Sequence, residues 1–276
     1  MRIFLFLFFI NFSAFAFLDV ENTPIAGGIA VINFKSNHTQ PTAFFYKNPV
    51  FVQKIKDNYW QALVGIPLLT KIGKKHLIIK DFSTRTIDFE VVSHTYKSQY
   101  ITLKGKKKKY VDPLKKHIKR IIKERKVLTQ ARKTFSASKK LSNNFILPVK
   151  GIISSPFGLK RFYNNKPRNP HSGLDFAAKL NTKIIAPMNG TIILTGHYFF
   201  NGKTVFIDHG QGLISAYIHM NKIKVKKGDY VKKGDIIGTV GKTGRSTGPH
   251  LHWGIYLNKT AINPYLLTNL KNDTKH

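Results

Sequence analysis

The sequence contains no cysteine. This absence excludes disulfide bonds, thiolate metal ligands and a cysteine nucleophile. Stability therefore has to come from apolar cores, and 276 residues are enough for one large domain or two modest ones. Because 42% of the residues are hydrophobic and 21% are charged, the composition is that of a folded protein.

Acidic residues are scarce, since 13 Asp and Glu stand against 46 Lys and Arg, for a formal net charge of +33. Such a charge is typical of proteins that bind polyanions, nucleic acid among them. The export signal described next argues against nucleic acid as a partner. Outside the cytoplasm the charge favours retention on the cell wall, on anionic lipids or on lipopolysaccharide. The alternative is that it reflects only solubility and a bias in composition.

A long apolar run is also missing. Arg2 is followed by apolar residues 3–10, a stretch too short for a transmembrane helix of about 20 residues. One positive charge, a short apolar core and an Ala-x-Ala end at residues 14–16 are typical of a secretory signal peptide. We therefore expect residues 1–16 to be cleaved and the rest to be periplasmic, with an uncleaved N-terminal anchor as the alternative.

Residues 17–100 are expected to form an N-terminal β-module. Short apolar runs at 27–32, 49–52 and 59–67 are each flanked by Gly, Pro, Asn or Asp. This is the pattern of short strands in a small β-sandwich. No group of metal-ligating residues is visible in this part of the sequence, so we interpret it as a packing or docking module.

Residues 101–144 are expected to be a basic linker that contains a helix, and they begin with a run of lysines at 104–109. Asp112 can cap the helix and Pro113 suits its first position. One helix face collects the apolar residues Leu114, Ile118, Ile121 and Leu128. The opposite face is almost entirely Lys and Arg, which could contact an anionic wall or membrane surface. A solvated helix that links two domains is the alternative.

Residues 145–270 are expected to form a second domain built on an antiparallel β-sheet, so that the whole protein is mainly β. Apolar runs at 184–186, 191–194, 204–207, 213–217 and 252–256 are separated by turns that contain glycine. A repeated Val-Lys-Lys-Gly-Asp at 225–229 and 231–235 predicts two matching units of strand and turn.

Four of the eleven histidines, together with one aspartate, are candidates for a site. His171 and Asp175 are four residues apart, and His250 and His252 are two apart. Even spacing puts side chains on one face of a strand. His219 follows the strand expected to end at residue 217.

Zinc suits this set, because it accepts neutral imidazole and carboxylate, and catalytic zinc sites keep three protein ligands plus water. The surplus histidines are then free for acid–base work and transition-state stabilisation. Spacing alone does not say which histidines bind the metal. His209 lies before a glycine turn and is interpreted as structural or as a supporting residue.

Three ordered blocks resemble the lysostaphin/LytM-type zinc metallopeptidases. They are His171-Ser172-Gly173-Leu174-Asp175, Tyr217-Ile218-His219-Met220, and Gly244-Arg245-Ser246-Thr247-Gly248-Pro249-His250-Leu251-His252. Ser155-Pro156-Phe157-Gly158 and the Val-Lys-Lys-Gly-Asp repeat resemble the framing segments of that family. The resemblance covers about residues 145–266. Residues 22–133 are similar to the β-module and linker helix that precede this domain in some Gram-negative cell-wall endopeptidases.

The resemblance implies that His171, Asp175 and His252 bind one zinc ion per chain and that His219 and His250 are the catalytic histidines. It also implies an open groove over the metal and metal-assisted hydrolysis of peptide bonds in peptidoglycan. Segment 161–169 is expected either to border the substrate or to be an ordinary surface loop.

The expected reaction is endopeptidase cleavage of the D-Ala–diaminopimelate cross-link during wall remodelling. Alternatives are carboxypeptidase trimming of stem peptides and cleavage of glycine bridges. A different class of function, a non-catalytic LytM-like domain that binds the wall or activates an amidase, also stays open. Such domains typically lack some of the metal ligands, and this sequence has the full set.

Overall fold

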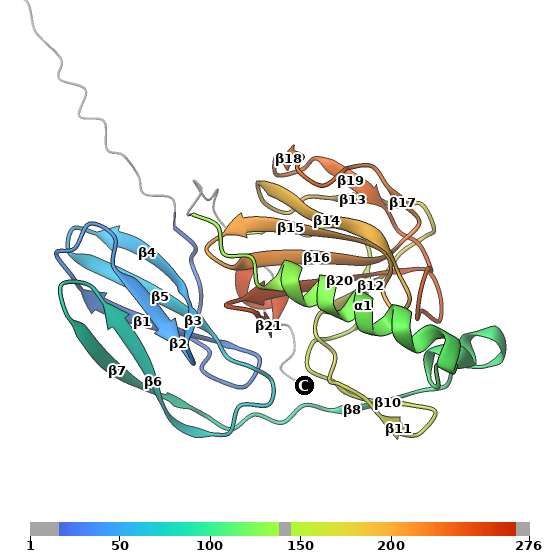
Figure 1. The fold of residues 1–276 in the computed structure, drawn as a ribbon, viewed down its shortest axis with the longest axis horizontal. Coiled ribbons are helices and arrows are strands. Elements are labelled where there is room, and N and C mark those ends of the chain that lie inside the picture. The colour runs from blue at the N-terminus through green and yellow to red at the C-terminus, as the bar shows by residue number, and fades with distance from the viewer. Residues whose placement is uncertain (1–16, 138–144, 269–276) are drawn as a thin grey trace, which may run out of the picture.

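The computed structural model describes residues 17–137 and 145–268. In these ranges strands dominate, and they form an N-terminal body and a larger C-terminal body joined by a linker that carries one α-helix (Figure 1). The signal peptide expected at residues 1–16 lies outside the described residues. Within the described ranges, no helix is both long and apolar enough to cross a lipid bilayer.

The N-terminal body is a sandwich of two antiparallel sheets, as expected. One sheet has the order β1-β5-β4, with bounds Ile29–Lys35, Tyr59–Gly65 and Phe51–Lys56. The other has the order β3-β2-β6-β7, with bounds Asn48–Pro49, Thr42–Phe45, Gly73–Lys80 and Thr84–Val91. Successive strand residues point to opposite faces, so Leu77 and Ile79 are buried while Lys80 is exposed. Both sheets contribute to the apolar core between them, which includes Phe45 and Trp60.

The outer face of the first sheet packs on the C-terminal body. Ile29, Phe51 and Leu63 belong to the large core that both bodies share. The buried side-chain amide of Asn258 accepts a hydrogen bond from the Gly65 amide at 2.7 Å and donates to the Gly65 carbonyl at 3.0 Å. The N-terminal body thus packs directly on the C-terminal body.

The C-terminal body is built on a large sheet with the order β18-β14-β15-β16-β20-β12-β9, and β21 is added beside β20. Its strands pair antiparallel, as expected. Their bounds are β9 Ile152–Ser155, β12 Leu174–Ala177, β14 Gly190–Tyr198, β15 Gly202–Gly210, β16 Leu213–Met220, β18 Tyr230–Val231, β20 His250–Leu257 and β21 Thr260–Ile262. A smaller sheet has the order β13-β19-β17, with bounds Lys183–Ile185, Ile236–Thr239 and Lys222–Ile223. A short 3₁₀ helix, η2 (Pro264–Leu267), follows β21.

The Val-Lys-Lys-Gly-Asp repeat forms two matching turns. In each, the aspartate side chain accepts a hydrogen bond from a backbone amide three residues earlier, Lys226 for Asp229 and Lys232 for Asp235. The glycines between them have φ values of +98° and +96°, a left-handed region that side chains disfavour. The strand prediction holds only at the start of the second unit, because Val231 lies in β18 and residues 225–229 belong to no strand.

The linker runs along the C-terminal body. β8 (Ser98–Ile101) pairs in parallel with β10 (Lys160–Tyr163), which forms a hairpin with β11 (Lys166–Pro167). A 3₁₀ helix, η1 (Gly105–Tyr110), and the helix α1 (Lys115–Arg132) complete the linker. Segment 161–169 is therefore largely a hairpin held at its edge by the linker.

The start of α1 differs from the expectation. The helix begins at Lys115 after Leu114, without a side-chain cap. The Asp112 carboxylate instead makes an ion pair of 2.8 Å with Lys166 of the hairpin. The carboxylate expected to cap the helix is thus paired with a lysine side chain instead.

The apolar face of α1 also differs from the expectation. Leu128 and Ala131 near its end pack on the large sheet, but Leu114 and Ile118 near its start are exposed. The helix extends past the edge of the sheet, as Figure 1 shows. Its first half lies against the turn after β14, where His117 contacts Phe199 and Glu124 accepts a hydrogen bond from the Phe199 amide, while Leu114 and Ile118 face solvent.

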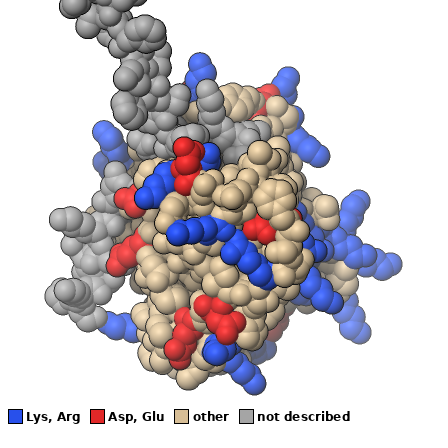
Figure 2. Space-filling view, turned by 90° about the vertical axis from the view of Figure 1, so that its left-hand side faces the viewer, with Lys and Arg blue, Asp and Glu red and all other residues tan. Residues whose placement is uncertain are grey.

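The basic character of the molecule is not uniform over its surface. On the face of the N-terminal body shown in Figure 2, Lys and Arg side chains are scattered and acidic side chains lie among them. The exposed side of α1 is more strongly basic, since it carries Lys115, Lys116, Lys119, Lys123 and Lys126. Any attraction to an anionic surface should therefore be strongest at the helix.

Candidate metal centre and groove

Strand register brings the candidate ligands together. β12 and β20 pair antiparallel, with Asp175 opposite His252. His171 precedes β12, and backbone hydrogen bonds with Leu159 and Gly158 hold it in place. Residues 81 positions apart in the sequence thereby come into direct contact.

Three ligand atoms converge in the interior. Nε2 of His171 lies 2.9 Å from Oδ1 of Asp175 and 3.0 Å from Nδ1 of His252. Nδ1 of His252 lies 2.7 Å from the same Asp175 oxygen. All three residues are buried, and together they form a group able to hold a metal ion.

The hydrogen bonds of this group fit a cation. Nδ1 of His171 lies 2.6 Å from the Pro156 carbonyl oxygen, which can only accept a hydrogen bond. The proton of a neutral His171 ring is therefore on Nδ1, and Nε2 presents a lone pair to the Asp175 carboxylate. Two acceptors that face each other need a positive charge between them. Two imidazoles and one carboxylate, with a histidine tied to a backbone carbonyl, suit zinc.

Charge states near neutral pH also suit a metal. Burial alone would raise the pKa of Asp175, but its contacts with His171 and His252 hold that pKa well below its usual range. Burial lowers the pKa of His252 to about 4, against the opposing effect of Asp175. The carboxylate is then ionised and the His252 ring is neutral, which are the states that metal binding requires.

His219 and His250 lie beside this group, with ring centroids 4.8 Å apart. Nδ1 of His219 lies 2.8 Å from the Thr243 carbonyl oxygen, and Nδ1 of His250 lies 2.9 Å from that of Gly248. Each Nδ1 therefore carries the proton of the neutral ring, and each Nε2 carries a lone pair. Burial, aided by the neighbouring His250 and His252, holds the pKa of His219 well below its ordinary value. His250 is less buried.

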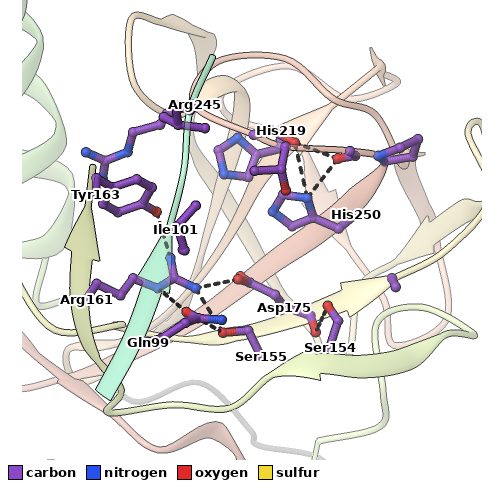
Figure 3. A pocket seen from close by; sticks show the side chains of 16 residues that line it. Gln99, Ile101, Ser154, Ser155, Arg161, Tyr163, Asp175, His219, Arg245 and His250 are labelled. Carbon is purple, nitrogen blue, oxygen red and sulfur yellow. Dashed lines mark hydrogen bonds and ion pairs between the residues drawn. The ribbon is translucent and has the colours of Figure 1, made fainter. Parts of the chain in front are cut away.

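The groove over the centre consists of two cavities of about 320 Å³ and 230 Å³. Asp175 and His250 line the first, and His171 and His252 line the second. Both are lined by Arg161, Tyr163, His219 and Arg245, which therefore stand where the two halves meet. Figure 3 shows these four residues in the first cavity. All five predicted site residues border this groove.

Two arginines of the groove were not singled out in the sequence. Arg161 comes from β10 and donates to Oδ2 of Asp175 at 2.6 Å. Arg245 comes from the loop before β20. Segment 161–169 thus contributes to the groove wall, and Arg245 lies inside the third family-like block, but neither position carries a pattern of its own.

His209 is structural, in agreement with its interpretation. Its Nδ1 lies 2.7 Å from the Asn189 carbonyl oxygen and its Nε2 lies 2.8 Å from the Ser215 hydroxyl. The ring is buried against Phe145, and it lines neither cavity of the groove.

Comparison with known proteins supplies the family. Residues 169–264 match the model of peptidase family M23, and residues 22–94 match the model of the M23 N-terminal domain. The peptidoglycan DD-endopeptidase ShyA of Vibrio cholerae is 38% identical over 112 residues, which are 40% of this chain and 26% of that protein. The DD-carboxypeptidase/endopeptidase Mpg of Neisseria meningitidis is 38% identical over 112 residues, 41% of this chain and 26% of its own length. The matched part thus spans about a quarter of each of these two relatives.

A solved structure matches almost the whole chain. The crystal structure of an M23 peptidase from Pseudomonas aeruginosa is 40% identical in sequence and has a TM-score of 0.76. The match covers 89% of this chain and 95% of that chain. The likeness includes both bodies and the linker between them, in the same order. A shared fold at this identity, with both family models matched in sequence, shows that the chain belongs to peptidase family M23.

Proposed function

We propose that this protein is a zinc metalloendopeptidase that hydrolyses peptide bonds in peptidoglycan. The observation that carries the proposal is the convergence of Nε2 of His171, Oδ1 of Asp175 and Nδ1 of His252 beside two further histidines. The names of the relatives ShyA and Mpg, both peptidases of the DD type, support the same chemistry.

In this proposal His171, Asp175 and His252 hold one zinc ion. Bound zinc would supply a Lewis acid that polarises the scissile carbonyl and lowers the pKa of a water molecule. His250 accepts the proton of the attacking water at Nε2, and its Nδ1–H stays fixed on the Gly248 carbonyl. We assign the base to His250 because it is less buried than His219, where a positive charge costs more.

His219 takes the complementary role. Its buried, neutral ring borders both halves of the groove, and the Thr243 carbonyl fixes its orientation. The proton that His250 takes from the water can pass to the leaving amine when the C–N bond breaks, and Nε2 of His219 can accept a hydrogen bond from the attacking water and hold it in place. General acid–base groups of this kind contribute roughly 10²- to 10⁴-fold to rate.

The proposed bond is the D-Ala–diaminopimelate cross-link. A groove made of two cavities that meet beside the metal group can accept an extended peptide, as an endopeptidase needs. The name of Mpg includes carboxypeptidase action, so trimming of stem peptides is the main rival. Purified cross-linked muropeptide dimer separates them by mass spectrometry. Two monomers support the endopeptidase, whereas an intact dimer with shortened stems supports the carboxypeptidase.

The rival of another class is a non-catalytic LytM-like domain that activates an amidase. The complete ligand set and the two histidines beside it favour catalysis. Protein that binds zinc tightly yet leaves both dimer and stem peptides unchanged would support the rival.

We further propose export by the N-terminal signal peptide and a periplasmic location, supported by the pattern of residues 1–16. We also propose that the basic linker attracts the enzyme to an anionic membrane or wall surface. The exposed Leu114 and Ile118 between lysines of α1 support a membrane contact, because an apolar strip flanked by cations suits the lipid interface.

A further inference from the structure

Arg245 is a cation in the groove without a counter-charge. Its guanidinium stacks over the rings of Tyr163 and Phe200, 4.6 Å and 5.1 Å from their centroids. Figure 3 shows the Tyr163 ring between the side chains of Arg245 and Arg161. Among the described residues, no carboxylate or other acceptor takes a hydrogen bond from this guanidinium. Burial lowers the pKa of Arg245, and the nearby cations Arg161 and Arg168 act in the same direction.

The other arginines of the groove are already engaged. Arg161 donates to the Asp175 carboxylate, the Ser155 hydroxyl and the Gln99 side chain. Arg132 donates to atoms of its own helix, α1. Asp175 is the single acidic residue among the described residues that line the groove. The groove is therefore positive, and among these arginines Arg245 is the one whose guanidinium has no hydrogen-bond acceptor in the described part of the chain.

A guanidinium packed against aromatic rings and free of acceptors is prepared for one kind of ligand. Its planar fork of N–H donors matches the two oxygens of a carboxylate, and the contacts with the rings restrict its movement. A neutral ligand group would leave the buried charge of Arg245 uncompensated, which is costly in a site of this depth.

We propose that Arg245 forms a subsite for the substrate carboxylate next to the scissile amide, on the leaving-group side. The proposal rests on the proposed function. In a D-Ala–diaminopimelate cross-link, the carbon that bears the acylated nitrogen also bears a free carboxylate. The same is true of D-Ala–D-Ala at the end of a stem peptide. In a glycine bridge that position is occupied by a further peptide bond, so no charge is available.

One subsite then explains a substrate range. It accepts both the cross-link and the terminal D-Ala–D-Ala bond, because both offer the same carboxylate at the same place. It selects against glycine bridges, although the metal chemistry would be identical. Arg245 is thus a specificity-determining residue rather than one that takes part in bond cleavage.

The test compares cross-linked dimer that has a free carboxylate beside the scissile bond with dimer in which this group is amidated. For the wild type, kcat/KM should be roughly 10- to 100-fold higher for the acid, as expected for a hydrogen-bonded charge pair. In Arg245→Gln the ratio of kcat/KM for the acid to kcat/KM for the amide should fall close to 1. Arg245→Lys should keep part of the preference, because lysine retains the charge but not the fork. The matched control, Arg132→Gln, removes a charge from the same groove and should keep the wild-type preference.

Binding gives a second readout that needs no turnover. In calorimetry with chelator-treated protein, acetylated D-Ala–D-Ala should bind more tightly than its C-terminal amide, and Arg245→Gln should abolish the difference. If Arg245→Gln does not fold, the acid–amide comparison on the wild type decides. A wild type that treats acid and amide alike, or an Arg245→Gln that keeps the preference, overturns the subsite. A wild type that cleaves neither dimer nor stem peptide overturns the proposed function instead.

Discussion

Substitution of Gly173 by alanine tests how tightly packing around His252 fixes the metal centre. Gly173 lies just before β12 and faces β20. A Cβ atom at this position would lie 2.4 Å from the Trp253 carbonyl oxygen and 2.9 Å from both Cε1 and Nε2 of His252. The nearest atom belongs to the backbone, so no side-chain rotation can relieve the clash. β20 has to move away from β12.

That movement acts on the ligand geometry directly. Nδ1 of His252 lies 2.7 Å from Asp175 and 3.0 Å from His171, so a displacement of several tenths of an ångström changes both distances noticeably. We expect zinc affinity to fall about 10- to 100-fold, the usual cost of disturbing what orients a metal ligand. Overpacking should also lower the free energy of unfolding by about 1–3 kcal/mol. Competition with a chromophoric chelator measures the zinc affinity, and urea unfolding measures the free energy of unfolding.

Gly254 supplies the matched control. It lies in β20 two residues after His252, and the nearest atom to a Cβ there is the Ser172 carbonyl oxygen at 3.3 Å. A small adjustment accommodates this contact, so Gly254→Ala should keep zinc affinity within about threefold, with destabilisation below about 1 kcal/mol. Equal zinc affinities for Gly173→Ala and Gly254→Ala would refute the reasoning.

Three further predictions concern the roles of single groups. His171→Ala should lose zinc and activity together, whereas His250→Ala should keep zinc in elemental analysis and lose roughly 10²- to 10⁴-fold in rate; metal loss in His250→Ala would contradict this. Because the pKa of His252 is about 4 when folded and 6.5 is its ordinary value, the unfolded state binds more protons between these pH values. Metal-free protein should therefore lose up to about 3 kcal/mol of stability as pH falls from 6.5 to 4, and equal urea midpoints at pH 7 and pH 4.5 would speak against it. Sedimentation with anionic vesicles should weaken steeply with salt, and replacing Lys119 and Lys123 by glutamine should weaken it further; unchanged binding would make α1 ordinary surface.

The strands were predictable because short apolar runs separated by glycine turns are typical of buried strands. The pairing of the strands was not predictable, because register depends on contacts between segments that are distant in the sequence. Spacing placed His250 and His252 on one face of a strand, but only the pairing of β12 with β20 sets Asp175 opposite His252. The metal group was therefore visible as a set of candidates, and the resemblance to a known family chose among them. The catalytic roles of His219 and His250 stay predictions.

The wrong expectations about α1 have a tertiary cause. Its apolar spacing is helical, and the helix exists, but near its start His117 contacts Phe199 and Ile118 faces solvent. Asp112 had the right chemistry for a helix cap, but its carboxylate pairs with Lys166 instead. The proposed role of Arg245 was likewise not predictable from the sequence, because it depends on aromatic rings and charges that only the tertiary structure places around this residue.

The loops that frame the strands have a chemical task that residue spacing does not reveal. Pro156, Thr243 and Gly248 each present a backbone carbonyl to Nδ1 of a histidine of the site. A carbonyl accepts only, so each loop fixes the proton on Nδ1 and leaves a lone pair on Nε2. For His171 that lone pair can bind a metal ion, and for His250 and His219 we propose that it accepts a proton or a hydrogen bond. The same carbonyl contact thus prepares both kinds of histidine, and we expect the distance from Asp175 to decide which role each ring takes.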